Sequence, residues 1–434
     1  MGFIMAKNKT IKYIDLFAGA GGLSEGFTRE GYEPIAHVEM DLAACYTLKT
    51  RLAYHYLKGS EKFDVYISYL KGEISRDELY AYVPNNLMES VINYAIGTKF
   101  NSEIHNIIHK KLGYSKVDLI IGGPPCQAYS LVGRARSADG MSGDKRNFLY
   151  IQYANYLEEY NPKLFVFENV LGLKSAKGGQ YLRDMKKLFF KKGYEMQLFT
   201  VDAKNFGVLQ SRRRVIIIGW KKNLKLNIPN IEELKSNLAG KVKSLLNDLP
   251  VLQTGEGIDR YVKYKTNTNS YLTESAIRNG INILTQHVSR PNNKQDKEIY
   301  SIAVEKWNSE KQRLNYNDLP DNLKTHKNRD SFFDRFKVVA EDLEYSHTVV
   351  AHISKDGHYY IHPDAKQNRS ISVREAARLQ SFPDDYYFEG VKEGNVKNNL
   401  FYNRTAAFKQ IGNAVPPLMA ASLAKALAKI IKTI

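Results

Sequence analysis

Four short apolar runs, each bounded by turn residues, constrain the fold of this chain more than any other feature. Runs of this length predict buried strands rather than helices. The segments between them, such as residues 147–160, have the pattern of helices. Strands that alternate with helices predict an α/β fold with a doubly wound, mostly parallel sheet. The four runs are residues 12–17, 117–123, 163–170 and 214–220.

Composition narrows the class of protein. Hydrophobic residues make up 43% of the 434 residues and charged residues 25%, which is typical of a globular protein of two domains. Cys45 and Cys126 are the only cysteines, so a disulfide framework or a Cys-rich zinc site is excluded. No run approaches the roughly 20 apolar residues that span a bilayer, and residues 1–10 do not look like a signal peptide. We therefore expect no membrane contact and a cytoplasmic chain.

The charge of the chain points to a class of partner. Lys and Arg number 63 against 46 Asp and Glu, which leaves a formal net charge of +17. An excess of this size favours a polyanionic partner, and nucleic acid is the first candidate.

A glycine cluster follows the first predicted strand in the sequence DLFAGAGG. Gly19, Gly21 and Gly22 let the backbone turn sharply and approach a ligand at the start of the next helix. The dinucleotide pattern GxGxxG requires glycine where Ser24 stands, so NAD is disfavoured. Glu39, in HVEMD, ends the second predicted strand, where an acid can bind ribose hydroxyls. A tight turn without a ligand is the alternative interpretation.

The loop GGPPCQAYS places Cys126 directly after a predicted strand. Ligands of α/β proteins bind at this edge of the sheet, and two prolines fix the direction of the loop. A lone cysteine is more often an inert core residue than a nucleophile. The glycine- and proline-framed loop favours the nucleophile here.

Charged residues also lie at the ends of the two remaining strands. Glu168 ends an apolar strand in FENV, where it could donate a proton or simply cap a helix. In QSRRRVIIIG, strand alternation sends Arg212 and Arg214 to one face and Arg213 to the other. Two guanidinium groups at a ligand edge suggest a clamp for phosphate or a carbonyl oxygen, whereas a solvated basic turn is the alternative.

Residues 221–368 show no comparable strand–helix pattern, and regular patterns return after them. Ser372 and Glu375 form a capping-box pattern, which predicts the start of a helix. The last 19 residues predict an amphipathic helix that opens at Pro416 and Pro417 and packs against the main sheet.

Taken in order, these motifs resemble those of the C5-cytosine-specific DNA methyltransferases, of the bacterial type II restriction-modification kind. The motifs in question are DLFAGAGG, the acid of HVEMD, GGPPCQAYS, FENV, QSRRR, RSISVREAARLQSFPDD and QIGNAVPP. The resemblance implies a Rossmann-like S-adenosylmethionine-dependent methyltransferase fold with a smaller target-recognition domain. The domains would be a catalytic domain at 1–224, target recognition at 225–368, the late motif helix and hinge at 369–409, and the C-terminal motif and helix at 410–434.

The resemblance also implies which residues bind S-adenosylmethionine. Glu39 would hold the ribose, and Leu149 would pack on the adenine, beside which Met40 replaces a more usual aromatic residue. An acid expected to bind the adenine amino group is Glu103 or Glu73, and we favour Glu103, which lies 23 residues before the cysteine of the proline loop. The other cofactor contacts would be Phe17, Gly19, Gly21, Gly22, Pro125, Asn413 and Val415.

The implied chemistry rests on four residues. Cys126 would add to C6 of cytosine, Glu168 would protonate N3, and Arg212 and Arg214 would orient the base and the loop. The target base would have to leave the duplex to be reached. The residues that read the DNA sequence would lie within about 250–335, on a structural base near His347 and Thr348.

The expected function is thus cytosine-5 methylation of duplex DNA by a monomeric bacterial enzyme, either beside a cognate restriction endonuclease or as an orphan. A tRNA methyltransferase on the same scaffold is a second hypothesis, although its branch has little between the arginine motif and the late helix. A catalytically inactive DNA-binding regulator is a third, and it would be expected to have lost Cys126, Glu168 or the glycines.

Overall fold

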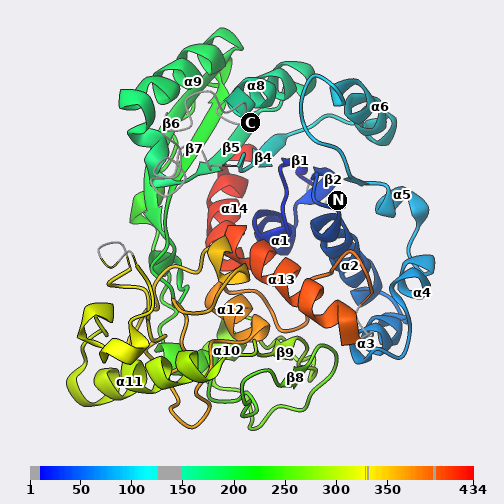
Figure 1. Cartoon of the computed structure of the whole chain (residues 1–434). Coiled ribbons are helices and arrows are strands. Elements are labelled where there is room, and N and C mark those ends of the chain that lie inside the picture. The colour runs from blue at the N-terminus through cyan, green and yellow to red at the C-terminus, as the bar shows by residue number, and fades with distance from the viewer. Residues whose placement is uncertain (1–9, 126–147, 328, 330–331, 394–396) are drawn as a thin grey trace.

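The computed structural model of the chain describes residues 10–125, 148–327, 329, 332–393 and 397–434 (Figure 1). A seven-stranded sheet in the order β3-β2-β1-β4-β5-β7-β6 forms its centre. The strands are β1 Lys12–Leu16, β2 Glu33–Val38, β3 Val91–Ile92, β4 Leu119–Gly122, β5 Leu164–Asn169, β6 Tyr194–Asp202 and β7 Arg213–Lys221. The first five are parallel, and β7 runs antiparallel to both β5 and β6. The predicted α/β class and mostly parallel sheet are confirmed.

Helices cover both faces of this sheet (Figure 1). One face packs on α6 (Asn101–Leu112), α8 (Leu149–Tyr160) and α9 (Gln180–Lys191). The other packs on α1 (Gly22–Arg29) and α14 (Pro417–Ile431). The last helix therefore returns to the first, as its amphipathic pattern predicts, and brings the late motif beside the glycine loop.

The long segment between β2 and β3 forms a helical layer with a core of its own. It contains α2 (Leu42–Lys58), α3 (Phe63–Lys71), α4 (Arg76–Ala81) and α5 (Asn85–Met88). Their apolar faces pack together and against Ile283 and Tyr387. The segment thus joins the sheet to the rest of the chain.

The residues after the sheet form a second unit with few regular elements. Its elements are β8 Gly257–Ile258, β9 His287–Val288, α10 Ser270–Glu274, α11 Lys294–Glu310, α12 Val373–Leu379 and α13 Lys397–Asn413. Short 3-10 turns join the elements of the whole chain: η2 Leu171–Lys174, η3 Ala176–Gly179, η4 Ala203–Phe206, η5 Lys222–Leu224, η6 Ile231–Glu233, η7 Val242–Leu245, η8 Tyr316–Asp318, η9 Asp321–Leu323 and η10 Ala351–Ser354. One core is shared by Leu245, Val339, Leu379 and Ile411, so residues on both sides of position 368 fold together. A smaller core surrounds α11.

Buried charges hold this second unit around α12. Ser372 and Glu375 form the predicted capping box, and Glu375 also pairs with Arg369 at 2.8 Å. Arg378 is 1% exposed and pairs with Asp248 at 2.5 Å and with a second carboxylate, Asp384, at 2.6 Å. Because an unpaired buried charge would cost several kcal/mol, these pairs fix where α12 lies.

The stretch Asn403–Ile431 is long and apolar enough in composition to cross a membrane, and 56% of its most apolar window is buried. Here it is divided between α13 and α14, and the apolar side of α14 packs on α1 and the sheet.

Candidate active site

The register of the parallel strands places five residues, at or just beyond the strand ends, in a row at one edge of the sheet. Ile92 pairs with Val38, Val38 with Leu16, Leu16 with Gly122 and Gly122 with Phe167. The next residue of each strand therefore lies at the same level of the carboxyl edge. In the order of the strands, these next residues are Asn93, Glu39, Phe17, Gly123 and Glu168.

The glycine loop opens on a left-handed backbone. Phe17 has a φ of 58°, Gly19 of 55° and Gly21 of 78°. The backbone N–H of Gly19 donates to Glu39 Oε2 at 2.8 Å, which ties this loop to the end of β2. A Cβ built on Gly19 would meet nothing within 4 Å, so the backbone borders open space there. This is the place that we expected a ligand to approach.

Two carboxylates lie under this loop. Glu39 accepts backbone N–H groups from Gly19 at 2.8 Å and Asp41 at 2.7 Å, and burial raises the pKa of Glu39. Asp15 is 1% exposed, and its Oδ2 has no hydrogen-bond partner among the described residues. Burial and the charge of Glu39 raise the pKa of Asp15 well above its usual value. Glu39, held beside the open space at Gly19, therefore suits a ligand that carries hydroxyl groups.

Gly21 and Gly22 are also closely surrounded by other parts of the protein. A Cβ on Gly22 would lie 2.2 Å from the carbonyl oxygen of Val415, and one on Gly21 would lie 2.7 Å from Leu48 Cδ2. Contacts within the protein therefore require glycine at both positions, and the φ of 78° at Gly21 agrees with the predicted sharp turn. The lack of a side chain at Gly22 allows the backbone of Val415 to lie against the start of α1. Asn413, two residues earlier in the chain, is exposed.

The structure does not place either candidate acid for the adenine at the end of β3. Glu103 lies exposed in the first turn of α6, and Glu73 follows α3 with its carboxylate 3.7 Å from Lys71. The residue that directly follows β3 is Asn93, whose amide donates to the carbonyl oxygens of Glu39 and Met40, both at 3.1 Å. Sequence reasoning missed Asn93 because β3 is only two residues long.

Met40 and Leu149 lie on the parts of the chain that we expected to flank an adenine. The Met40 side chain is 67% exposed directly after Glu39, although large apolar side chains are usually buried. Leu149 is half-buried at the first position of α8.

A second cluster surrounds Glu168 at the end of β5. Arg214 Nε lies 2.9 Å from Glu168 Oε1, and both side chains are 13% exposed. A Cβ on Gly123 would lie 2.8 Å from Glu168 Oε2, so the proline loop leaves β4 against this carboxylate. Asn169 holds the loop by donating to the Pro124 carbonyl oxygen at 3.3 Å.

Pro125 is exposed at the end of this loop, and Cys126 follows it. Cys126 lies in 126–147, outside the residues that the structure describes. The chain thus enters that segment directly beside the Glu168–Arg214 pair.

Arg212 is separated from this cluster, which corrects the expectation of a paired clamp. Its side chain is buried and donates to three backbone carbonyl oxygens, of Val349 at 2.6 Å, Gly412 at 3.1 Å and Ala414 at 2.8 Å. Because β7 begins at Arg213, the alternation that we assumed does not extend back to Arg212. Arg212 holds the late motif in place, whereas Arg214 contacts the acid.

The chain matches the family of C-5 cytosine-specific DNA methylases over residues 11–79 and 91–429. It belongs to this family. The methylase is 43% identical to the type II methyltransferase M.Bpa9945I of Bacillus paralicheniformis, over 96% of this chain and 98% of that protein. It is 30% identical to the type II methyltransferase M.DdeI of Desulfomicrobium norvegicum, over 95% of this chain and 87% of that protein. The resemblance of the motifs is therefore confirmed, and the chain is a C5-cytosine DNA methyltransferase of the type II kind.

Solved structures support the fold of the methylase. A methyltransferase encoded within an E. coli prophage superposes with a TM-score of 0.63 at 24% identity, over 97% of this chain and 99% of that one. This likeness confirms the Rossmann-like methyltransferase fold.

In this methylase, the second unit docks directly on the arginine motif. The backbone N–H of Ser211 donates to the Ser346 carbonyl oxygen at 2.9 Å, and that of Ser346 donates to the Leu209 carbonyl oxygen at 3.0 Å. The Thr348 hydroxyl donates to the Ser211 carbonyl oxygen at 2.6 Å. The segment that contains His347 and Thr348 is thus hydrogen-bonded to the arginine motif at the start of β7.

Proposed function

We propose that the enzyme transfers a methyl group from S-adenosylmethionine to C5 of a cytosine that has been turned out of duplex DNA, with Cys126 as the nucleophile. The observation that carries this proposal is the Glu168–Arg214 pair, which lies against the loop that leads to Cys126. An acid held in this way beside a potential thiolate provides the two groups that addition to a cytosine ring needs.

The described residues fit the proposed cofactor. Glu39, beside the open space at Gly19, would accept the ribose hydroxyls. Asn93 uses its amide N–H groups on backbone carbonyls, so its oxygen is left to accept from the adenine amino group. S-adenosylmethionine, when bound, supplies an electrophilic methyl group. The remaining contacts would come from Phe17, Gly19, Met40, Pro125, Leu149, Asn413 and Val415.

The chain's own residues would activate the base. Carbon C5 of cytosine is too electron-poor to take a methyl group directly. Addition of the Cys126 thiolate to C6 forms the S–C6 bond, while Glu168 donates a proton to N3, and C5 becomes nucleophilic. After C5 has been methylated, loss of its proton breaks the S–C6 bond, and the N3 proton returns to Glu168. Arg214 orients the Glu168 carboxyl group through both steps.

The partners follow from this chemistry. A stacked base cannot be reached by a thiol on a loop, so the enzyme would extrude the target nucleotide from duplex DNA. We propose that it acts as a monomer and protects the sites of a cognate endonuclease from cleavage.

The proposal is tested by trapping the covalent bond. DNA in which cytosine is replaced by 5-fluorocytosine should form a complex with the wild-type enzyme that survives SDS, because fluorine cannot leave C5 as a proton does. The complex should require S-adenosylmethionine and should be absent with Cys126→Ser. An enzyme that methylates ordinary DNA but forms no such complex would contradict the proposed adduct.

A further inference from the structure

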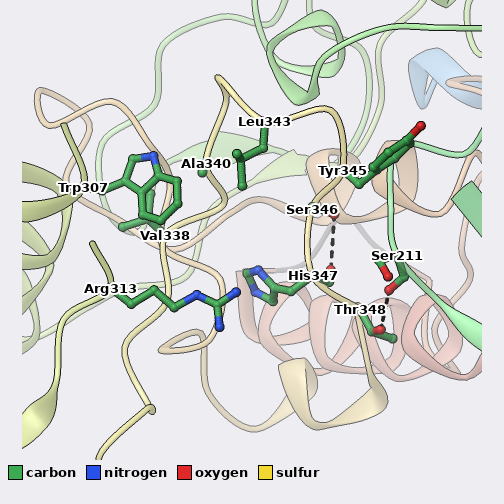
Figure 2. A pocket seen from close by; sticks show the side chains of 10 residues that line it. All are labelled: Ser211, Trp307, Arg313, Val338, Ala340, Leu343, Tyr345, Ser346, His347 and Thr348. Atoms are coloured by element: carbon green, nitrogen blue, oxygen red, sulfur yellow. Dashed lines mark hydrogen bonds between the residues drawn. The ribbon is translucent and has the colours of Figure 1, made fainter. Parts of the chain in front are cut away.

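A cleft of about 320 Å³ lies between the end of α11 and residues 343–348 (Figure 2). Its wall includes Ser211, Trp307, Arg313, Tyr345 and His347. The cleft reaches the lower end of the size range of sites that hold small organic groups, which is roughly 300–1,000 Å³. Among the described residues, neither Glu168 nor Arg214 lines this cleft, and no residue proposed to contact the cofactor does.

A short piece of chain leads from the cleft to Arg214, which pairs with the proposed catalytic acid, Glu168. Ser211 on its wall is hydrogen-bonded to Ser346 and Thr348, and it lies three residues before Arg214. Three residues of extended chain span about 10 Å. A nucleotide close to the target cytosine would therefore come within reach of the cleft when the target lies against Glu168.

Arg313 is the free cation of this cleft. It is exposed and makes no hydrogen bond or ion pair with any residue in the described part of the chain. Figure 2 shows its side chain extended toward the ring of His347. A guanidinium group offers a flat fork of N–H donors, and here this fork has no protein acceptor to satisfy it.

His347 is held as a neutral ring beside this cation. Its Nε2–H donates to the Tyr359 carbonyl oxygen, and its ring stacks on Tyr360 with the centroids 5.2 Å apart. Burial lowers the pKa of His347 to about 4. The ring is therefore neutral at pH 7, does not repel Arg313 and leaves Nδ1 as an acceptor.

Two side chains of the remaining, largely apolar wall are aromatic, Trp307 and Tyr345, and a basic group lies at the rim. The Trp307 indole is fixed by its N–H, which donates to Asp342 Oδ1 at 2.9 Å. Lys204 Nζ lies 5.6 Å from the centre of the Tyr345 ring. An aromatic wall and a neutral imidazole suit a nucleobase better than a phosphate, whereas the basic rim suits the DNA backbone beside it.

We propose that Arg313 reads a guanine of the recognition sequence, by donating two N–H groups to its O6 and N7 in this cleft. The inference rests on the proposed function, because it assumes DNA bound with its target cytosine at Glu168. Bidentate arginine–guanine contacts are the commonest specific contacts to DNA bases, and a lysine at the same place could act only as a point charge.

The test removes one guanine atom at a time. Once the methylated motif of the wild-type enzyme has been mapped, each guanine of a motif duplex is replaced singly by 7-deazaguanine, which lacks the N7 acceptor. At one position the wild-type kcat/KM should fall about 10- to 100-fold. For Arg313→Ala, 7-deazaguanine at that position should not lower kcat/KM further. Arg313→Lys should behave like Arg313→Ala although it keeps the charge.

The matched control is Lys294→Ala, at the opposite end of α11, where the side chain is 91% exposed. In this variant, 7-deazaguanine at each position should lower kcat/KM by the same factor as in the wild type. If Arg313→Ala weakened methylation of all duplexes equally and kept each 7-deazaguanine penalty, the side chain would contact phosphate and the proposal would be overturned. A wild-type enzyme that methylated no DNA would overturn the proposed function instead.

Discussion

Arg212 and Arg214 are separated by one residue but make entirely different contacts. Arg214 lies 2.9 Å from the carboxylate of Glu168, whereas Arg212 is buried against backbone carbonyl oxygens 137 to 202 residues away in the chain. One short basic motif therefore serves the fold through Arg212 and, in the proposed mechanism, the chemistry through Arg214. The two functions can be separated by substitution.

Replacing each arginine by methionine should give opposite results. Arg212→Met leaves three buried carbonyl groups without donors and should lower the free energy of unfolding by about 3 kcal/mol. Arg214→Met should leave the urea midpoint nearly unchanged and reduce methyl transfer at least tenfold. Urea unfolding and DNA methylation assays on the same preparations measure both effects. Equal loss of stability in the two variants would contradict this division.

Glu168→Gln keeps the size of the side chain and removes the proton that it would donate. Turnover should fall by about two orders of magnitude or more. Affinity for S-adenosylmethionine, measured by equilibrium dialysis, should change little, because two strands, β1 and β4, lie between the strand of Glu168 and the strand that ends at Glu39. If cofactor binding collapsed while turnover remained, Glu168 would be a structural residue.

Residues that directly follow long apolar strands could be predicted from the sequence. Glu39 and Glu168 each end such a strand, and the register of the sheet brings both to one edge. Asn93 could not be predicted, because a two-residue strand has no recognisable pattern. The contacts of Arg212 could not be predicted either, because their partners are distant in the chain and use only backbone atoms.

At the scale of elements, the start of α1 and the segment before α14 depend on each other. The carbonyl oxygen of Val415 occupies the space where a side chain of Gly22 would begin. This contact places the late motif beside the glycine loop, where the cofactor would bind.

Gly22→Ala should therefore affect both stability and cofactor binding. The new methyl group must push the Val415 backbone away, so we expect a melting temperature lower by several degrees and at least tenfold weaker binding of S-adenosylmethionine. Gly59→Ala is the matched control, because a Cβ there meets nothing within 4 Å. A variant of Gly22 with unchanged cofactor affinity would show that the late motif does not shape the pocket.

Helices and strands that bury few residues could not be predicted from apolar patterns in the sequence. Helix α11 buries only Ile299, Tyr300, Ala303 and Val304 over 17 residues, so its apolar stripe is weak. Its capping box, formed by Asn293 and Asp296, is the signal that could have revealed it. Strand β6 lies at the sheet edge, buries only three of its nine residues and lacks the continuous apolar run of the central strands.

At the scale of the whole molecule, four buried histidines link stability to pH. Burial lowers the pKa of His37, His287, His347 and His362 to about 4. The unfolded chain binds protons at these positions below about pH 6.5, whereas the folded chain does not, so they lose their stabilising effect as the pH falls. Buried carboxyl groups with a raised pKa, such as Glu389, act in the opposite direction.

A single substitution isolates the contribution of one histidine. His287 donates to the Pro250 carbonyl oxygen at 2.8 Å, and a glutamine amide can replace this donor. His287→Gln should be less stable than the wild type at pH 7. The difference in free energy of unfolding between the wild type and the variant, measured by urea unfolding, should decrease as the pH falls from about 6.5 to about 5. The decrease should be up to about 1.4 kcal/mol per pH unit. If this difference in free energy of unfolding stayed constant or increased as the pH fell, His287 would not be neutral in the folded enzyme.

The central claim, sequence-specific methylation of cytosine C5 through Cys126, is tested most directly by mapping 5-methylcytosine in plasmid DNA. The plasmid is recovered from a host that lacks its own cytosine methylation and expresses either the wild-type chain or Cys126→Ser. We expect 5-methylcytosine at one short motif with the wild type and none with the variant, because an alcohol is a far poorer nucleophile than a thiolate at neutral pH. Unmethylated cytosine throughout the wild-type plasmid, or the same methylated motif with Cys126→Ser, would contradict the account.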